Sequence, residues 1–195
     1  MARPRVIEQD DILDAAEAVV VRSGAVHLTL DAVAIEAGIS KASVIYDYKT
    51  KQQLIRAVIE RRVDREYERI QETTAALGAT PSASIRGLIA AASDAPPDDA
   101  RSVAVSLGAA LAQDNELRKP IEDYYTRVIA SIMQTSQKPR GGLLAFLALE
   151  GLKALEWKNF HSWSDQERKR ILQEIGWLVD VDPLSDKICG EPDSS

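Results

Sequence analysis

The chain has 195 residues, of which 45% are hydrophobic, 28% are charged and only 5% are aromatic. This composition excludes a disordered chain, a collagen-like repeat and a disulfide scaffold, and the single cysteine, Cys189, allows no intrachain disulfide. No apolar run reaches the roughly 18 residues that a membrane-spanning helix needs, and the acidic N-terminus is unlike a secretory signal. We therefore expect a soluble, cytoplasmic protein without a membrane partner.

The formal net charge is −6, but the charges are unevenly distributed. Residues 1–62 carry nine basic and nine acidic side chains, so the rest of the chain carries the whole excess of acid. Between Ser40 and Lys51, three lysines stand against one aspartate. A locally basic segment in a neutral region is compatible with phosphate binding, although charge alone does not establish it.

Apolar residues recur at helical spacing along nearly the whole chain, which predicts an all-α fold of about nine helices. After a first helix, the pattern predicts a short helix from Leu30 to Ala37 with Thr29 at its N-cap. A third helix follows, capped by Ser40. The sequence 50–53 matches a capping box and opens a long fourth helix, along which the chain divides into two parts.

In the second half, Thr80-Pro81 is expected to restart a helix, with the hydroxyl at the N-cap and proline at the first helical position. Residues 138–142, rich in glycine and proline, predict a loop. Pro120 either kinks a helix or marks its start. The remaining pattern predicts helices over residues 101–113, 115–134 and 143–160, and one that follows a capping box at 164–167.

Residues 29–51, TLDAVAIEAGISKASVIYDYKTK, have the spacing of a helix-turn-helix. Ala34 is small where two helices must cross closely, and Gly38 permits the backbone turn. Val44 and Tyr48, four residues apart, are expected to face inward, while Lys41 stands at the start of the second helix. A helix presented in this way fits the major groove with its N-terminal residues at base edges.

This stretch, with the preceding ILDAAEAVVVRSG and the following TKQQLIRAVI, resembles the tetracycline-repressor (TetR) family of bacterial transcriptional regulators. The resemblance covers roughly residues 8–60, where the family's usual run AGVSKGTLYxYFxSKxxL corresponds to AGISKASVIYDYKTKQQL. It implies a DNA-binding domain over residues 1–50, with the helix-turn-helix at about 29–48. A helical ligand-binding and dimerisation domain would follow over 51–181, beginning with the linking helix, and a frayed tail over 182–195.

By the same resemblance, some residues match positions that contact phosphates (Thr29, Ser43, Lys51) and others match base-facing positions (Lys41, Ala42, Ile45). Lysine can donate to guanine acceptors, and apolar side chains can touch a thymine methyl group. The candidate DNA-binding residues are Thr29, Ser40, Lys41, Ala42, Ser43, Ile45, Tyr46 and Lys51. Arg3 and Arg5 either add minor-groove or phosphate contacts or belong to a solvated arm.

Two residues depart from the family pattern. Ile45 stands where the family commonly has a tyrosine. Asp47 stands where a neutral or basic residue often meets a phosphate, so its carboxylate is expected either to repel DNA or to pair with Lys51.

The resemblance also implies a helical body that dimerises and encloses a small ligand. Independently, residues 143–160 are too apolar for a helix with one wet side, which favours a two-fold four-helix interface over a buried monomer core. The candidate interface residues are Leu147, Leu152, Leu155, Ile171, Ile175 and Leu178. Candidate pocket residues, for which core or interface packing is the alternative, are Gln113, Tyr124, Tyr125, Met133, Phe146 and Trp157.

The sequence contains almost no evidence of a catalytic site. The two histidines form no Glu-x-x-His motif, and the chain has neither a cysteine cluster nor a glycine-rich phosphate loop. We therefore expect no enzyme, no metal and no cofactor. The sequence predicts a homodimeric transcriptional repressor that binds a palindromic operator in double-stranded DNA and is released by an unidentified small-molecule effector. The alternatives are a helical dimer that binds a protein or small molecule without regulating DNA and, less favoured, an all-helical enzyme.

Overall fold

The computed structural model describes residues 9–95 and 98–183. Within these residues the chain forms nine α-helices and one single-turn 3₁₀ helix and no strand, which confirms the predicted fold class. Contacts divide it into two compact units, residues 1–66 with 96–124 and residues 67–95 with 125–195. The boundary expected at residue 50 stays a prediction. Arg3, Arg5 and nearly all of the expected tail lie outside the described residues.

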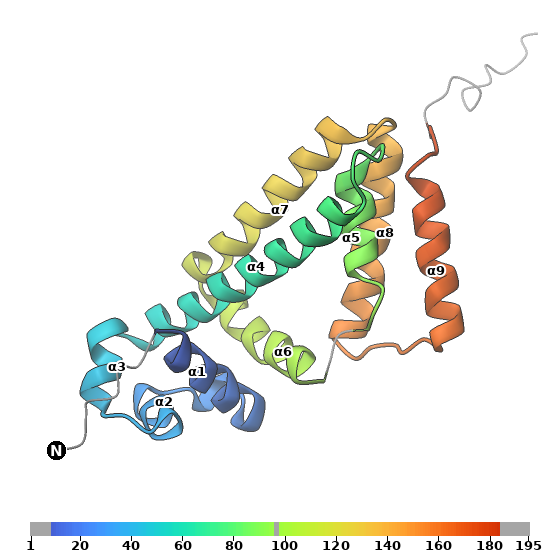
Figure 1. The fold of residues 1–195 in the computed structure, drawn as a ribbon. Coiled ribbons are helices and arrows are strands. Elements are labelled where there is room, and N and C mark those ends of the chain that lie inside the picture. The colour runs from blue at the N-terminus through green and yellow to red at the C-terminus, as the bar shows by residue number, and fades with distance from the viewer. Residues whose placement is uncertain (1–8, 96–97, 184–195) are drawn as a thin grey trace, which may run out of the picture. The chain divides into compact units, whose positions relative to one another are not determined.

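The first unit holds the helix-turn-helix (Figure 1). Its core is formed by the apolar face of the first helix packed against the short helices and the start of the long one, with Ile12, Val33 and Val44 at most 1% exposed. Its elements are α1 (Gln9–Ser23), η1 (Ala25–His27), α2 (Leu30–Ala37), α3 (Lys41–Asp47), the first part of α4 (Lys51–Ala76), α6 (Asp98–Gln113) and the start of α7 (Asn115–Thr135).

Ion pairs join α4 to α1 beside this core. The guanidinium of Arg61, whose side chain is 9% exposed, lies 2.8 Å from Asp14 and 2.6 Å from Glu17. Arg62 pairs with the second oxygen of Glu17 at 2.8 Å. Because Arg61, Arg62 and Glu17 are largely shielded from solvent, their pairs hold α4 against α1 more firmly than exposed pairs would. The start of α4 is thereby fixed next to the helix-turn-helix.

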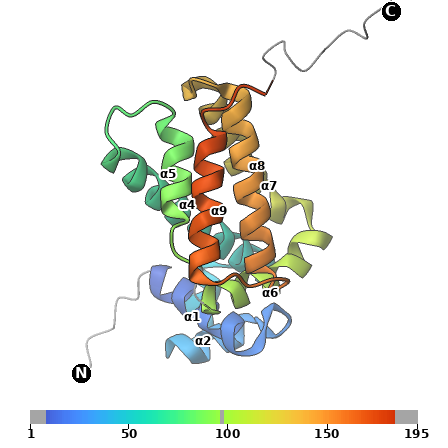
Figure 2. The same ribbon diagram turned by 90° about the vertical axis from the view of Figure 1, so that its right-hand side faces the viewer.

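The second unit contains α5 (Ala83–Ala91), the later parts of α4 and α7, α8 (Pro139–Trp157) and α9 (Asp165–Leu178). Helices α8 and α9 lie side by side (Figures 1 and 2). Leu149 and Leu152 of α8 and Leu172 and Ile175 of α9 are buried. Ser164 caps α9 by accepting from the Glu167 amide at 3.2 Å, as the predicted capping box requires.

The loop predicted over residues 138–142 is wrong, because α8 begins at Pro139 and includes Gly141 and Gly142. These glycines serve close packing instead of a turn. A Cβ at Gly141 would lie 2.6 Å from the Leu178 carbonyl oxygen, and one at Gly142 would lie 2.7 Å from the Ser136 hydroxyl oxygen. Only a residue without a side chain permits both approaches.

The restart predicted at Thr80-Pro81 is also wrong, since α5 begins at Ala83 after Ser82. Ser82 has a left-handed backbone (φ 59°) and is 2% exposed, and its hydroxyl accepts from the Gln137 amide at 3.2 Å. Pro120 lies inside α7, which starts at Asn115, so the proline does not mark the start of this helix.

Candidate nucleic-acid interface

The turn between α2 and α3 is built from backbone hydrogen bonds that a glycine makes possible. Gly38 adopts a left-handed conformation (φ 67°, ψ 35°), and its amide donates to the Ile35 carbonyl. The Ile39 amide donates to the Ala34 carbonyl at 2.9 Å, which completes a Schellman motif. Partly buried Ile39 packs against the core and fixes the direction in which the chain leaves α2.

Helix caps set the boundaries of both helices, as predicted. The Thr29 hydroxyl accepts from the Ala32 amide at 3.0 Å at the start of α2. The Ser40 hydroxyl accepts from the Ser43 amide at 3.1 Å at the start of α3. Each cap satisfies an amide that the helix itself leaves unpaired.

Helix α3 has one buried and one exposed side, as its spacing predicts. Val44 is 0% and Tyr48 is 9% exposed, and both belong to the core of the first unit. Burial, followed by the nearby charge of Asp47, raises the pKa of Tyr48. On the opposite side Ile45 is 40% and Tyr46 is 86% exposed. A base-reading surface requires an exposed outer face of this kind on a firmly anchored helix.

The remaining candidate DNA-binding residues also lie at the surface. Lys41, Ala42 and Ser43 are exposed in the first turn of α3, and Thr29 is exposed at the cap of α2. Lys51, at the first position of α4, donates from its ammonium to the Val26 carbonyl at 3.0 Å. The structure therefore gathers these residues around the helix-turn-helix.

The structure gives Asp47 and Lys51 different partners. Asp47 is the last residue of α3 and accepts from the Gln9 side chain at 3.3 Å, whereas Lys51 bonds to Val26. Residues 48–50 separate α3 from α4, so the four-residue spacing does not fall within one helix.

Two ion pairs of α2 were not predicted from the sequence. Asp31 lies 2.8 Å from the Lys41 ammonium, and Glu36 lies 2.6 Å from the Arg22 guanidinium. The hydrogen bond from Arg22 holds the pKa of Glu36 below its usual range. The signal that could have identified the first pair is the turn itself, which folds the first turn of α3 back toward α2.

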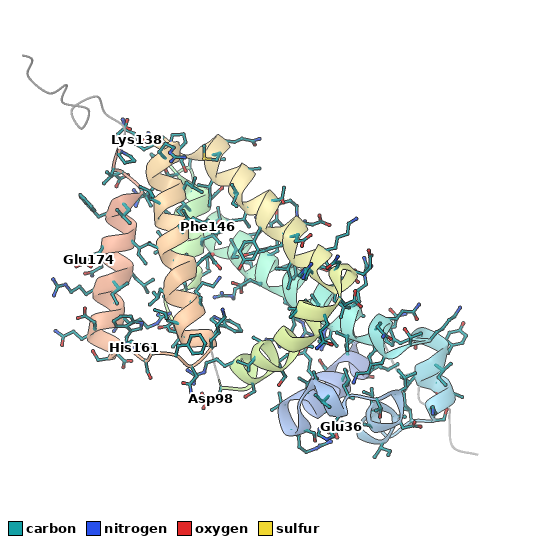
Figure 3. The ribbon with its side chains drawn as sticks, turned by 180° about the vertical axis from the view of Figure 1, so that it is seen from behind. Glu36, Asp98, Lys138, Phe146, His161 and Glu174 are labelled. Atoms are coloured by element: carbon teal, nitrogen blue, oxygen red, sulfur yellow. The ribbon has the colours of Figure 1, made fainter. Side chains whose placement is uncertain are left out.

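Among the candidate ligand residues, the structure brings Tyr125 and Phe146 together. Their rings meet edge to face with centroids 6.2 Å apart, and Phe146 lies on α8 (Figure 3). The Tyr125 hydroxyl donates to Glu150 at 2.7 Å, and the other Glu150 oxygen lies 2.9 Å from the Lys153 ammonium. This polar group was not predicted.

The other pocket candidates are dispersed. Met133 is 39% exposed on α7 and Trp157 is partly buried at the end of α8. Exposed Gln113 and buried Tyr124 belong to the first unit. Their part in ligand binding stays a prediction.

The candidate interface residues differ in accessibility. Leu147 is 56% and Leu155 is 39% exposed, whereas Leu152 and Ile175 are at most 5% exposed within one chain. Ile171 and Leu178 are partly buried. Leu152 and Ile175 therefore support the packing of α8 on α9 and offer a partner almost no surface.

Residues 9–95 and 98–183 contain neither a candidate metal site nor a candidate membrane span. Histidine, cysteine and acidic side chains form no group there that could hold a metal ion. No helix in the same ranges has the length and apolar character needed to cross a bilayer.

The fold and the exposed second helix of the helix-turn-helix define a DNA-binding regulator, and the family comparison agrees. Residues 12–58 match the sequence model of the bacterial regulatory proteins of the tetR family. Residues 82–180, more than half of the chain, match the tetracyclin repressor-like C-terminal domain. The chain belongs to the TetR family and is a transcriptional regulator of that family. No curated protein sequence matches it significantly.

Solved structures show the same fold at low identity. A transcriptional regulator from Rhodococcus sp. Rha1 is 15% identical, covers 89% of this chain and 96% of its own, and has a TM-score of 0.71. The multidrug binding protein EbrR, complexed with malachite green, is 18% identical over 89% of this chain and 98% of its own, with a TM-score of 0.66. A protein from Saccharomonospora viridis in complex with choline is 17% identical over 87% and 94%, with a TM-score of 0.67.

Proposed function

We propose that the protein is a cytoplasmic homodimeric repressor that binds a palindromic operator through α3 and leaves it when a small molecule binds the C-terminal helical domain. The observation that carries this proposal is the outer face of α3, where Ile45 and Tyr46 are exposed while Val44 and Tyr48 anchor the helix. Two such helices, related by a two-fold axis, would enter successive major grooves about 34–36 Å apart.

The chemistry of the exposed residues supports separate roles at the DNA. Lys41 can donate to guanine O6 and N7, and Ala42 and Ile45 can contact thymine methyl groups. Thr29 and Ser43 carry hydroxyls that can donate to phosphate. Phosphate contacts position the protein on the DNA, and base contacts select the sequence.

Exposed apolar residues on α8 and α9 support the homodimer. Leu144, Leu147 and Leu155 are 38%, 56% and 39% exposed on α8, and Trp177 is 66% exposed on α9. A second copy would cover these side chains in a self-complementary two-fold contact. Leu147→Glu is expected to give a monomer by sedimentation at micromolar concentration, while the control Lys169→Glu, at an exposed site on α9, leaves the dimer intact. A monomeric wild-type protein would contradict this part of the proposal.

The C-terminal domain supports a ligand-responsive function. The multidrug binding protein EbrR has been solved with malachite green, and the Saccharomonospora viridis protein with choline. In this chain Tyr125 and Phe146, whose rings meet in the second unit, are the proposed ligand contacts. Helix α4 is part of both units, so one continuous helix connects the ligand-binding part of the chain to the DNA-binding part. The ligand shifts the population only by its difference in affinity for the two states.

Lysine substitution tests the DNA contact. Lys41→Ala is expected to weaken operator binding about 5- to 150-fold, because a good base contact contributes about 1–3 kcal/mol. Fluorescence anisotropy would compare it with Lys169→Ala, whose exposed lysine lies on α9. Equal operator affinity in both variants would exclude Lys41 from the contact.

A further inference from the structure

Before any DNA arrives, Lys41 already has an anionic partner in the protein. Its ammonium lies 2.8 Å from an Asp31 oxygen, and the two side chains are 53% and 61% exposed. Asp31 stands in the first turn of α2 and Lys41 is the first residue of α3. The turn at Gly38 therefore places a carboxylate against the lysine proposed to read a base.

The position of Asp31 has opposite consequences for the free protein and for DNA binding. A carboxylate in the first turn of a helix interacts favourably with the helix dipole, so Asp31 stabilises α2 in the folded protein. However, Asp31 follows Thr29, a proposed phosphate contact, by two residues. Its negative charge opposes the approach of a phosphate, and its contact with Lys41 offsets a positive charge that would attract one.

We propose that Asp31 is a positioning residue that acts through Lys41 and lowers the binding of this lysine to DNA phosphate. This inference rests on the proposed role of α3. On a random sequence, Lys41 can neutralise a phosphate only by giving up Asp31. On the operator, a guanine edge offers the lysine two acceptors in a fixed place and compensates for the lost pair.

The weakness of the pair suits this role. An exposed ion pair contributes little to stability, so the pair can yield to a well-placed base contact.

The second ion pair of α2 provides a matched control. Glu36, labelled in Figure 3, pairs with Arg22 at 2.6 Å and has no part in the contact with Lys41. Glu36→Gln and Asp31→Asn change the net charge by the same amount on the same helix. A general electrostatic effect would therefore be similar in both variants.

The test measures DNA binding by the full-length protein, Asp31→Asn, Glu36→Gln, Lys41→Ala and the double variant Asp31→Asn/Lys41→Ala. Anisotropy titrations from 50 to 200 mM salt would use the selected operator fragment and a scrambled duplex of equal composition. Asp31→Asn is expected to bind the scrambled duplex about three- to fivefold more tightly at 50 mM salt. Its slope of log affinity against log salt should steepen by about 0.9, which corresponds to one additional phosphate contact.

The double variant separates this inference from the proposed function. If Asp31 acts through Lys41, the gain on scrambled DNA disappears in the Lys41→Ala background, and Glu36→Gln shows no comparable gain. A gain of equal size with and without Lys41, or in Glu36→Gln, overturns the inference while leaving the proposed function intact. Unchanged operator binding by Lys41→Ala excludes Lys41 from the DNA contact and overturns the inference as well. Asp31→Ser, which keeps a residue favoured at helix starts, repeats the test if the asparagine variant unfolds.

Discussion

Replacing Glu156 by glutamine should destabilise the C-terminal helices by about 3 kcal/mol or more. Glu156 and Arg168 join α8 to α9 through two hydrogen bonds, of 2.7 and 3.2 Å, and their side chains are 6% and 7% exposed. The substitution preserves shape but leaves a buried guanidinium without its counterion.

The size of the expected loss of stability depends on the other groups around the Arg168 guanidinium. Arg168 also donates to carbonyl oxygens at the end of α5, at 2.6 Å to Ser93 and 2.8 Å to Ala92. These carbonyls carry partial negative charge and compensate in part for the lost carboxylate. We therefore expect the lower end of the roughly 3–5 kcal/mol measured when one partner of a buried pair is removed.

Thermal unfolding at fixed protein concentration measures this effect. At about 2–4 °C per kcal/mol for a chain of this size, Glu156→Gln should lower the Tm by about 6–12 °C. The control is Glu174→Gln, which breaks a pair with Arg170 on α9 whose side chains are 63% and 70% exposed, and which should cost about 0.5 kcal/mol. Equal, small losses in both variants would refute the reasoning.

Four further variants test other parts of the structure. Gly141→Ala should destabilise α8, because its Cβ would lie 2.6 Å from the last carbonyl oxygen of α9, whereas Gly108→Ala meets open space and should stabilise α6 by about 0.5–1 kcal/mol in chemical denaturation. Val44→Ala removes fully buried methyl groups and should cost about 2 kcal/mol of stability, measured in the same way, while weakening operator binding. Because Arg22 lowers the pKa of Glu36, their pair stabilises the fold above the ordinary carboxyl pKa and is lost as pH falls through the lowered value. The Tm difference between wild type and Glu36→Gln should therefore exist at pH 7 and vanish in acid.

The helix boundaries that sequence predicts correctly depend on short-range chemistry. Thr29, Ser40 and Ser164 each cap a helix by accepting from an amide three residues later, so the two residues of each cap lie close together in the sequence. The two sides of α3 were predictable for the same reason, because a helical period alone places Val44 and Tyr48 on the face opposite Tyr46.

Predictions failed where residues far apart in sequence decide the local structure. Gly141 is read as a turn residue until the end of α9 is seen against it. Ser82, and not Thr80, precedes α5 because its hydroxyl bonds to Gln137, 55 residues away. A separation of 75 residues likewise hides the link between Arg168 and the end of α5, since no periodicity connects positions that only packing brings together.

At the candidate site, sequence predicted which side chains would be exposed but not how their charges are compensated. Lys41 was expected at the start of α3, and the structure places it there, but its contact with Asp31 depends on the angle between two helices. Asp47 was expected either to repel DNA or to pair with Lys51, and its contact with Gln9 of α1 could not be read from local spacing. Charge compensation is a tertiary property, and it decides how strongly this surface attracts DNA.

We propose above that this TetR-family regulator recognises a specific palindromic operator through α3. Selection of genomic fragments by the purified protein, followed by footprinting of the enriched fragments, tests it most directly. The expected result is a protected palindrome whose half-sites lie one helical turn apart and whose protection is lost in Lys41→Ala. Weak binding that is independent of sequence and disappears at modest salt would contradict it.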